Sequence, residues 1–194
     1  MTGIEFFRFK NENKVEKGRL LISEPFSADP NFVRSVVLLC DHNESGSFGF
    51  VLNKPSLVRV NEVLDRIHNL SEIVYVGGPV QQDTLHFIHT LETIDNPVAV
   101  CQGIYWGGTL DSLTLMDTTA KISDNEIRFF LGYCGWGPGQ LEAELEDDAW
   151  IVCDFVTERF LFQTDPQDMW KVALDNMGGR FSVYANYPTD PRLN

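Results

Sequence analysis

The chain has 194 residues, of which 43% are hydrophobic and 22% charged, and its formal net charge is −13. This length fits one domain, and the hydrophobic fraction is too high for a disordered chain. The apolar runs are too short to span a bilayer. The chain also has no lysine- or arginine-rich run, which a protein needs to neutralise nucleic-acid phosphates. We therefore expect no membrane span and no direct binding to nucleic acid.

The first residues and the cysteines indicate the compartment. Residues 1–10 lack a basic start followed by an apolar stretch, so we expect no secretory signal and a cytoplasmic location. The chain has four cysteines and no CxxC pair: Cys40, Cys101, Cys134 and Cys153. In a reducing compartment we expect them to be thiols, three of them inside apolar segments where cysteine acts as a small hydrophobe.

In the first third of the chain, strand patterns follow a loosely tethered lead-in over residues 1–18. Segments 19–23 and 35–41 are rich in branched residues and bounded by turn formers, which predicts two strands. Asn43 to Gly46 is a turn signal. The alternating aromatic and small residues that follow predict the second strand of a hairpin, ending at Pro55.

The middle third predicts one helix and several strands. Asn61 can cap a helix that runs to about His68, and residues 73–76 form a strand pattern that stops at Gly77-Gly78-Pro79. Further strands are predicted over 84–90, 97–105 and 113–116.

The last third contains the helix patterns. Ser123 with Glu126 forms a capping-box pattern, and the apolar spacing that follows predicts a helix from there to Cys134. A second helix is predicted from Pro138, then a strand over 149–156. A third follows the Asp165-Pro166 start and ends at Gly178, and residues 185–194 are expected to be an irregular tail. Strands followed by helices predict one α+β domain over 19–184, with an irregular mixed sheet and helices packed beside it.

The first candidate site is the end of the strand over 35–41. Residues two apart on a strand point the same way, so Cys40 and His42 could form a thiolate–imidazole pair or half of a zinc site. In the alternative, Cys40 belongs to the core and residues 41–43 build the turn. His86 and His89 lie three apart on a predicted strand and face opposite ways, so they cannot hold one metal ion. We predict no metal and no cofactor.

The second candidate site is the glycine-rich segment 132–142. Its glycines surround Tyr133 and Trp136 and end at a helix start, a pattern that can shape a cleft. Glu142 and Glu146 lie four apart on one helix face, where they could act as an acid–base pair or form a solvated acidic face. Cys134 has no nearby lysine or arginine in sequence to lower its pKa, so a reactive thiol there is unsupported.

Several segments together resemble the YqgE/AlgH family, small bacterial proteins otherwise known as an uncharacterised family. The matching segments occur in the family's order and cover nearly the whole chain past the lead-in: 20–25, 29–32, 35–43, 49–51, 53–55, 77–80, 131–133, Trp136, 139–142, Glu144, Trp150 and 162–164. The resemblance implies one α+β domain and no known reaction. A transcriptional-regulator label is attached to one member and has been spread across the family.

These observations lead to one hypothesis and one alternative. We expect a cytoplasmic binding or regulatory protein that acts on an unknown protein or small-molecule partner and affects transcription at most indirectly. The cleft candidates from the residues and the resemblance are His42, Asn43, Asn53, Gly77, Gly78, Tyr133, Trp136, Gln140 and Glu142. The alternative is a thiol- or carboxylate-dependent hydrolase or transferase that uses Cys40 or Cys134 with His42 and Glu142.

Overall fold

One ten-residue strand, β9 (Ile127–Trp136), organises the sheet because it pairs with three other strands. The computed structural model describes residues 13–27, 29–119, 122–123 and 125–188. In the described residues the chain forms ten strands, eight of them in the order β10-β1-β2-β3-β9-β6-β8-β7; β5 also pairs with β9, and β4 pairs with β5. All the strand pairs are antiparallel except β5 with β9, so the sheet is mixed.

The other strands are short. Their bounds are β1 Leu20–Ser23, β2 Val36–Asn43, β3 Gly46–Val51, β4 Pro55–Arg59, β5 Ile73–Val76, β6 Val80–His89, β7 Val98–Cys101, β8 Ile104–Trp106 and β10 Trp150–Cys153. The described helices are α1 Val60–Val63, α2 Leu110–Thr119, α3 Gln140–Glu146, α4 Glu158–Gln163, α5 Met169–Met177 and α6 Gly179–Tyr184. The class is α+β, as the order of patterns predicts.

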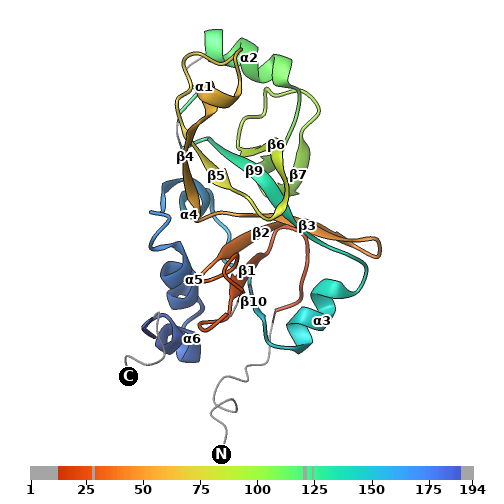
Figure 1. Ribbon diagram of the computed structural model, residues 1–194, viewed down its shortest axis with the longest axis vertical. Coiled ribbons are helices and arrows are strands. Elements are labelled where there is room, and N and C mark those ends of the chain that lie inside the picture. The colour runs from red at the N-terminus through yellow and green to blue at the C-terminus, as the bar shows by residue number, and fades with distance from the viewer. Residues whose placement is uncertain (1–12, 28, 120–121, 124, 189–194) are drawn as a thin grey trace, which may run out of the picture.

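The helices lie in three places around the sheet (Figure 1). α1 and α2 lie at one end, beside β4 to β7. At the other end α4, α5 and α6 lie on one side of the sheet and α3 lies on the opposite side. The described helices are all too short and too polar to cross a bilayer.

Burial on both faces explains why some strands of the sheet have almost continuous apolar sequences. β1, β10 and the first five residues of β2 are buried along their whole length. One face packs into a cluster that holds Trp170 and the other apolar residues of α4 to α6, and the other face packs against Leu141 of α3. A strand that is buried on both faces has a nearly continuous apolar sequence, which is the pattern of segments 20–22 and 36–40.

Three predicted elements are wrong. Segment 123–134 was expected to be a helix, but residues 127–136 form β9, because the apolar spacing of a helix is contained in a longer apolar run that is buried on both sides. Segment 113–116 was expected to be a strand and lies in α2. The helix predicted over 61–68 is reduced to α1, since Leu64 is already extended.

The two ends of the chain are described only in part. Of the lead-in, Asn13 donates to the carbonyl of Val152 over 3.1 Å, and the N–H of Gly18 donates to Leu39 over 2.7 Å. Residues 1–12 and 189–194 lie outside the described residues. α6 begins at Gly179, directly after the predicted helix end at Gly178, and residues 185–188 form no further helix or strand.

Candidate functional site

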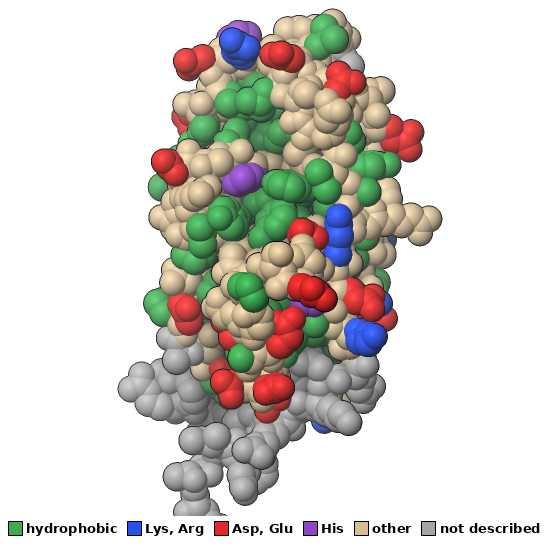
Figure 2. All heavy atoms as spheres, turned by 90° about the vertical axis from the view of Figure 1, so that its right-hand side faces the viewer, with side chains coloured by type: hydrophobic (Ala, Val, Ile, Leu, Met, Phe, Trp, Pro, Cys, Tyr) green, Lys and Arg blue, Asp and Glu red, His purple; other side chains and the backbone are tan. Residues whose placement is uncertain are grey.

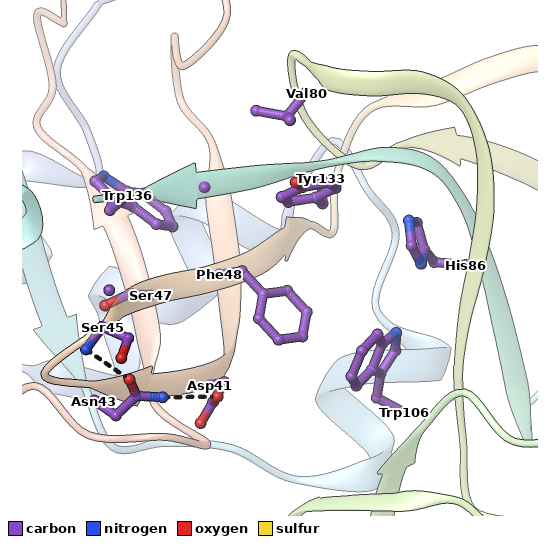
Figure 3. Close-up of a pocket in the computed structure, with 12 residues that line it drawn as sticks. Asp41, Asn43, Ser45, Ser47, Phe48, Val80, His86, Trp106, Tyr133 and Trp136 are labelled. Carbon is purple, nitrogen blue, oxygen red and sulfur yellow. Dashed lines mark hydrogen bonds between the residues drawn. The ribbon is translucent and has the colours of Figure 1, made fainter. Parts of the chain in front are cut away.

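A cleft of about 620 Å³ lies between the β2–β3 hairpin, β9 and the strands β6 and β8. It is lined by Asp41, Asn43, Ser45, Gly46, Ser47, Phe48, Val80, His86, Trp106, Tyr133, Gly135 and Trp136 (Figure 3). Figure 2 shows hydrophobic side chains gathered in the middle of one face of the molecule, around a histidine, with acidic side chains gathered below them. The cleft therefore combines residues from five strands and one hairpin turn.

One end of the cleft is aromatic. Phe48 lies with its ring centroid 4.7 Å from that of Trp106 and 6.2 Å from that of Tyr133, in both cases edge to face. His86 lies 5.9 Å from Tyr133 and 6.3 Å from Trp106, measured between ring centroids. Such edge-to-face and tilted contacts fix the rings against one another, so the walls are set by packing within the sheet.

Two polar atoms at this aromatic end have no hydrogen-bond partner among the described residues. They are Nε2 of His86 and Nε1 of Trp106, and both are shielded from solvent. Burial lowers the pKa of His86 below its ordinary value, so its imidazole is neutral at neutral pH. A buried polar atom without a partner costs free energy, and a ligand with a matching group would remove that cost.

The other end of the cleft is polar and belongs to the β2–β3 hairpin. The carboxylate of Asp41 accepts from the Asn43 amide over 3.0 Å, and the Asn43 oxygen accepts from the Ser45 N–H over 2.8 Å (Figure 3). In the described part of the chain, no lysine or arginine contributes to the lining. An acidic, aromatic cleft without a basic side chain favours a neutral or cationic ligand over an anion.

The structure brings the two predicted segments together beside this cleft. Nδ1 of His42 lies 2.7 Å from Oγ of Ser47, the residue that pairs with it across the hairpin. Nε2 of His42 lies 3.7 Å from a carboxylate oxygen of Glu142, at the start of α3. Ser47 also pairs with Trp136 on β9, so one strand, β3, lies between the strands that carry the imidazole and the indole. His42 and Glu142 are not among the residues that line the cleft.

Tyr133 and Trp136 line the cleft, and Glu144 fixes the second of them. One carboxylate oxygen of Glu144 accepts from the indole N–H of Trp136 and from that of Trp150, each over 2.8 Å. The other accepts from Gln140 over 3.0 Å. Gln140 also accepts from the N–H of Gly137 over 3.0 Å, so its side chain holds the loop before α3.

Three other predicted residues serve the fold. Asn53 accepts from the N–H of Val36 and donates to the carbonyl of Arg34, which joins two segments of the sheet. Gly77 and Gly78 cross over β9 so closely that a Cβ would lie 2.3 Å from the Gly132 oxygen or 2.2 Å from Tyr133. Their lack of a side chain allows this close contact with β9.

The buried cysteines do not fit the chemistry that a reactive thiol would require. Burial raises the pKa of Cys134 to about 12 and that of Cys153 to about 11, and it raises the pKa of Cys40 well above its ordinary value. The Cys40 side chain is buried in the core cluster, as the alternative interpretation of segment 40–43 holds. Buried thiols with raised pKa values do not favour a thiolate–imidazole pair at Cys40 and His42.

The two histidines of β6 have different surroundings, and only one of them lines the cleft. His89 is buried, with Nε2 2.8 Å from the carbonyl of Gly107 and Nδ1 accepting from the Leu91 N–H, so it is structural. His86, three residues earlier, lines the cleft. Phe48, Trp106 and Val80 were not predicted as site residues. The alternation along β3 and β6, which places Phe48 and His86 on the same side of a sheet, was the available signal.

Comparisons with known proteins agree with this architecture. The AlgH-like family model matches residues 20–182. A UPF0301 protein of Cytophaga hutchinsonii is 44% identical over 182 residues, covering 93% of this chain and 100% of that protein. One from Chlorobium limicola is 42% identical, covering 94% of this chain and 97% of that protein.

Two solved structures share the fold. The solution structure of the AlgH protein from Pseudomonas aeruginosa matches with a TM-score of 0.72 and 30% identity, covering 93% of this chain and 98% of that one. A crystal structure of a protein from Corynebacterium diphtheriae matches with a TM-score of 0.78 and 23% identity, covering 96% of this chain and 100% of that one. The extent of the family match and the identity of the relatives show that this chain belongs to the AlgH-like family.

Proposed function

We propose that the protein is a cytoplasmic binding protein whose cleft takes up a small organic molecule with an aromatic or flat apolar group and a cationic end. The apolar group lies among Phe48, Trp106 and Tyr133, and the cationic end faces Asp41 on the hairpin. Any effect on transcription follows from this binding and is indirect, since the chain is acidic.

The observation that carries the proposal is an aromatic wall that shares one cleft with the Asp41 carboxylate and with Nε2 of His86, which has no partner in the described residues and in one tautomer can accept from an ammonium group. Structural packing alone would favour satisfied or solvent-exposed nitrogens at His86 and Trp106. Cation–π attraction to the rings and the Asp41 carboxylate both favour a positive group.

The test uses 2-phenylethylamine, which has a ring and an ammonium group, against phenylacetate, which has the ring and a negative charge. Binding is followed in ¹H–¹⁵N spectra through the indole N–H signals of the four tryptophans, assigned with single Trp→Phe variants. We expect the amine to shift the Trp106 signal saturably and the acid to shift it at least about tenfold more weakly, which corresponds to about 1.4 kcal/mol.

A matched pair of variants locates the binding. Phe48→Ala removes one wall of the cleft and should weaken binding of the amine, whereas Phe155→Ala, which removes a ring packed outside it, should not. Equal shifts from both probes, or an undiminished shift in Phe48→Ala, would contradict the proposal.

A second candidate function is supported by the His42 contacts. Ser47 lines the cleft and lies 2.7 Å from the imidazole, whose other nitrogen faces Glu142. This order of hydroxyl, imidazole and carboxylate is that of a serine hydrolase, in which the imidazole takes the hydroxyl proton as the oxygen attacks an acyl carbon. It replaces the cysteine version of the hydrolase alternative.

A fluorophosphonate probe separates the two functions. In a hydrolase, the Ser47 oxygen would attack the phosphorus of the probe, forming an O–P bond and displacing fluoride, while His42 takes the hydroxyl proton. The labelled protein would show a mass shift that Ser47→Ala and His42→Ala abolish and Ser45→Ala retains. An unlabelled wild-type protein excludes the hydrolase and leaves the binding protein.

A further inference from the structure

Arg128, a buried arginine without a carboxylate partner among the described residues, lies outside the cleft, near the start of β9. Arg128 is buried, with only 6% of its surface exposed. In the described residues, no carboxylate lies within ion-pair distance of its guanidinium. Buried charges are normally paired, because removing an ion from water costs several kcal/mol.

The protein satisfies this guanidinium only in part. Nη1 donates to the carbonyl of Leu52 over 3.0 Å and approaches the Met169 sulfur at 3.6 Å. The guanidinium carbon lies 4.6 Å from the centre of the Tyr75 ring. Nη2 and Nε have no hydrogen-bond partner in the described part of the chain, and neither is sealed from solvent. Burial lowers the pKa of Arg128, because removal from water disfavours the charged guanidinium.

Arg128 lines a pocket of about 320 Å³ between β5 and the start of β9, with the end of β4 on its wall. A second guanidinium, Arg59, lies on its wall and is held by a hydrogen bond to the Ser71 carbonyl. The Glu72 carboxylate also belongs to the wall. Two positive groups and one negative group leave the pocket with one net positive charge.

The remaining walls are mainly apolar. Ile73, Tyr75, Ile127 and Phe162 surround the space beside Arg128, and Asn125 contributes an amide. A ligand must therefore carry a single negative charge on a group that accepts hydrogen bonds, and a small apolar body. A planar carboxylate matches the two donors of a guanidinium fork better than a multiply charged phosphate would beside Glu72.

We propose that this pocket is a second binding site that takes a small organic monocarboxylate, with Arg128 binding the carboxylate at the base of the pocket and Arg59 binding it at the rim. The site is separate from the cleft, since the two share no lining residue. The opposite charge preference of the two pockets also makes their ligands distinguishable.

The experiment titrates the wild-type chain with benzoate, with the neutral amide benzamide and with inorganic phosphate. Isothermal calorimetry gives the dissociation constants, and the Arg Nε–H signals in ¹H–¹⁵N spectra give the location. We expect benzoate to bind saturably and to shift the Arg128 signal, and benzamide to bind at least about tenfold more weakly, as the loss of a charge-assisted hydrogen bond predicts.

Three variants test the assignment to this pocket. Arg59→Gln and Arg128→Lys should each weaken benzoate binding by about tenfold or more, the second because lysine lacks the fork. Arg66→Gln removes an equal charge from an arginine whose side chain is 78% exposed and outside the pocket, so it should leave benzoate binding unchanged.

Several results would overturn the proposal. They are equal binding of benzoate and benzamide, a shift that does not saturate, or equal effects of Arg59→Gln and Arg66→Gln. Tighter binding of phosphate than of benzoate would overturn the carboxylate assignment. If Arg128→Lys fails to fold, Arg59→Gln decides, because Arg59 is exposed and its replacement leaves the core intact.

Discussion

Glu144 shows how one side chain can fix two tryptophans. Its carboxylate accepts from the indoles of Trp136 and Trp150, whose rings lie edge to face with centroids 6.0 Å apart. Both rings are nearly buried, at 6% and 3% exposed, so removing the acceptor that they share is costly.

We expect Glu144→Ala to lower the free energy of unfolding by about 2–4 kcal/mol, because two buried indole donors lose an acceptor. Urea unfolding followed by tryptophan fluorescence measures this loss. Glu146→Ala, two residues further on the exposed side of α3, is the control and should change stability by less than about 0.5 kcal/mol. Equal effects of the two variants would show that the carboxylate of Glu144 does not hold the rings.

The thiols give a second prediction for single residues. With a pKa of about 12, Cys134 should not react with iodoacetamide at pH 8 in the folded protein, and buried Cys40 and Cys153 should not react either. Mass spectrometry of the labelled protein checks this, and labelling in guanidinium chloride should modify all four cysteines. Rapid labelling of Cys134 in the native protein would restore the cysteine enzyme as a hypothesis.

Among the elements, α2 is held against segment 68–70 by the carboxylate of Asp117. It accepts from the backbone N–H groups of His68, Asn69 and Leu70, at 2.7–3.2 Å. Burial alone would raise the pKa of Asp117, but the three backbone hydrogen bonds outweigh it and lower the pKa below 3.8. The carboxylate is thus more acidic in the folded chain than in the unfolded chain.

A group with a lowered pKa stabilises the fold above its unfolded pKa and loses this effect as the pH falls through its folded pKa. Asp117→Asn should therefore destabilise the protein at pH 7 by about 1–3 kcal/mol. The difference from wild type should shrink below about pH 3.8. Thermal unfolding of both proteins at a series of pH values tests this, with exposed Asp111→Asn as the control. A difference that persists at low pH would contradict the assignment.

The elements also show what could be predicted from sequence. β1, β2, β3, β5 and β10 are visible as apolar runs or alternation between turn formers. The sequence predicts a helix over β9 because Ser123 and Glu126 form a capping-box pattern and the apolar residues after them have helical spacing. In the structure the Ser123 N–H does donate to the Glu126 carboxylate, but this bond closes a turn before a strand. α2 was missed because its threonines suggest a strand, whereas their hydroxyls bond to helix carbonyls.

The candidate site was predicted only in part for a related reason. Tyr133, Trp136 and Asn43 stand in segments that look unusual by themselves. Phe48 and His86 lie on strands that the sequence predicts. Trp106 lies just past the predicted strand over 97–105, which the structure divides into β7 and β8. The meeting of the three residues depends on the strand order around β9. No local pattern carries that order.

For the whole molecule, β9 joins the two ends of the sheet. Its first residues pair with β5 and β6, and its last pair with β3. One core cluster also includes residues from β1, β2, β6, β9, β10 and the helices α4 to α6. A sheet with a shared central strand and a shared core has no boundary along which it could unfold in parts.

We therefore expect one cooperative unfolding transition. Far-ultraviolet circular dichroism and tryptophan fluorescence should give the same urea midpoint, and native-state hydrogen exchange should find the slowest amides in β9. Two separated midpoints would show that the ends of the sheet unfold independently.

The close packing of the β2–β3 hairpin tip against β9 affects how a ligand associates with the cleft. Gly46 lies so close to the carbonyl of Trp136 that a Cβ would come within 2.3 Å of it, and the hairpin is thereby seated on β9. The cleft is therefore preformed, and a ligand can bind without a preceding conformational change. Its observed association rate should then rise in proportion to its concentration, without a plateau.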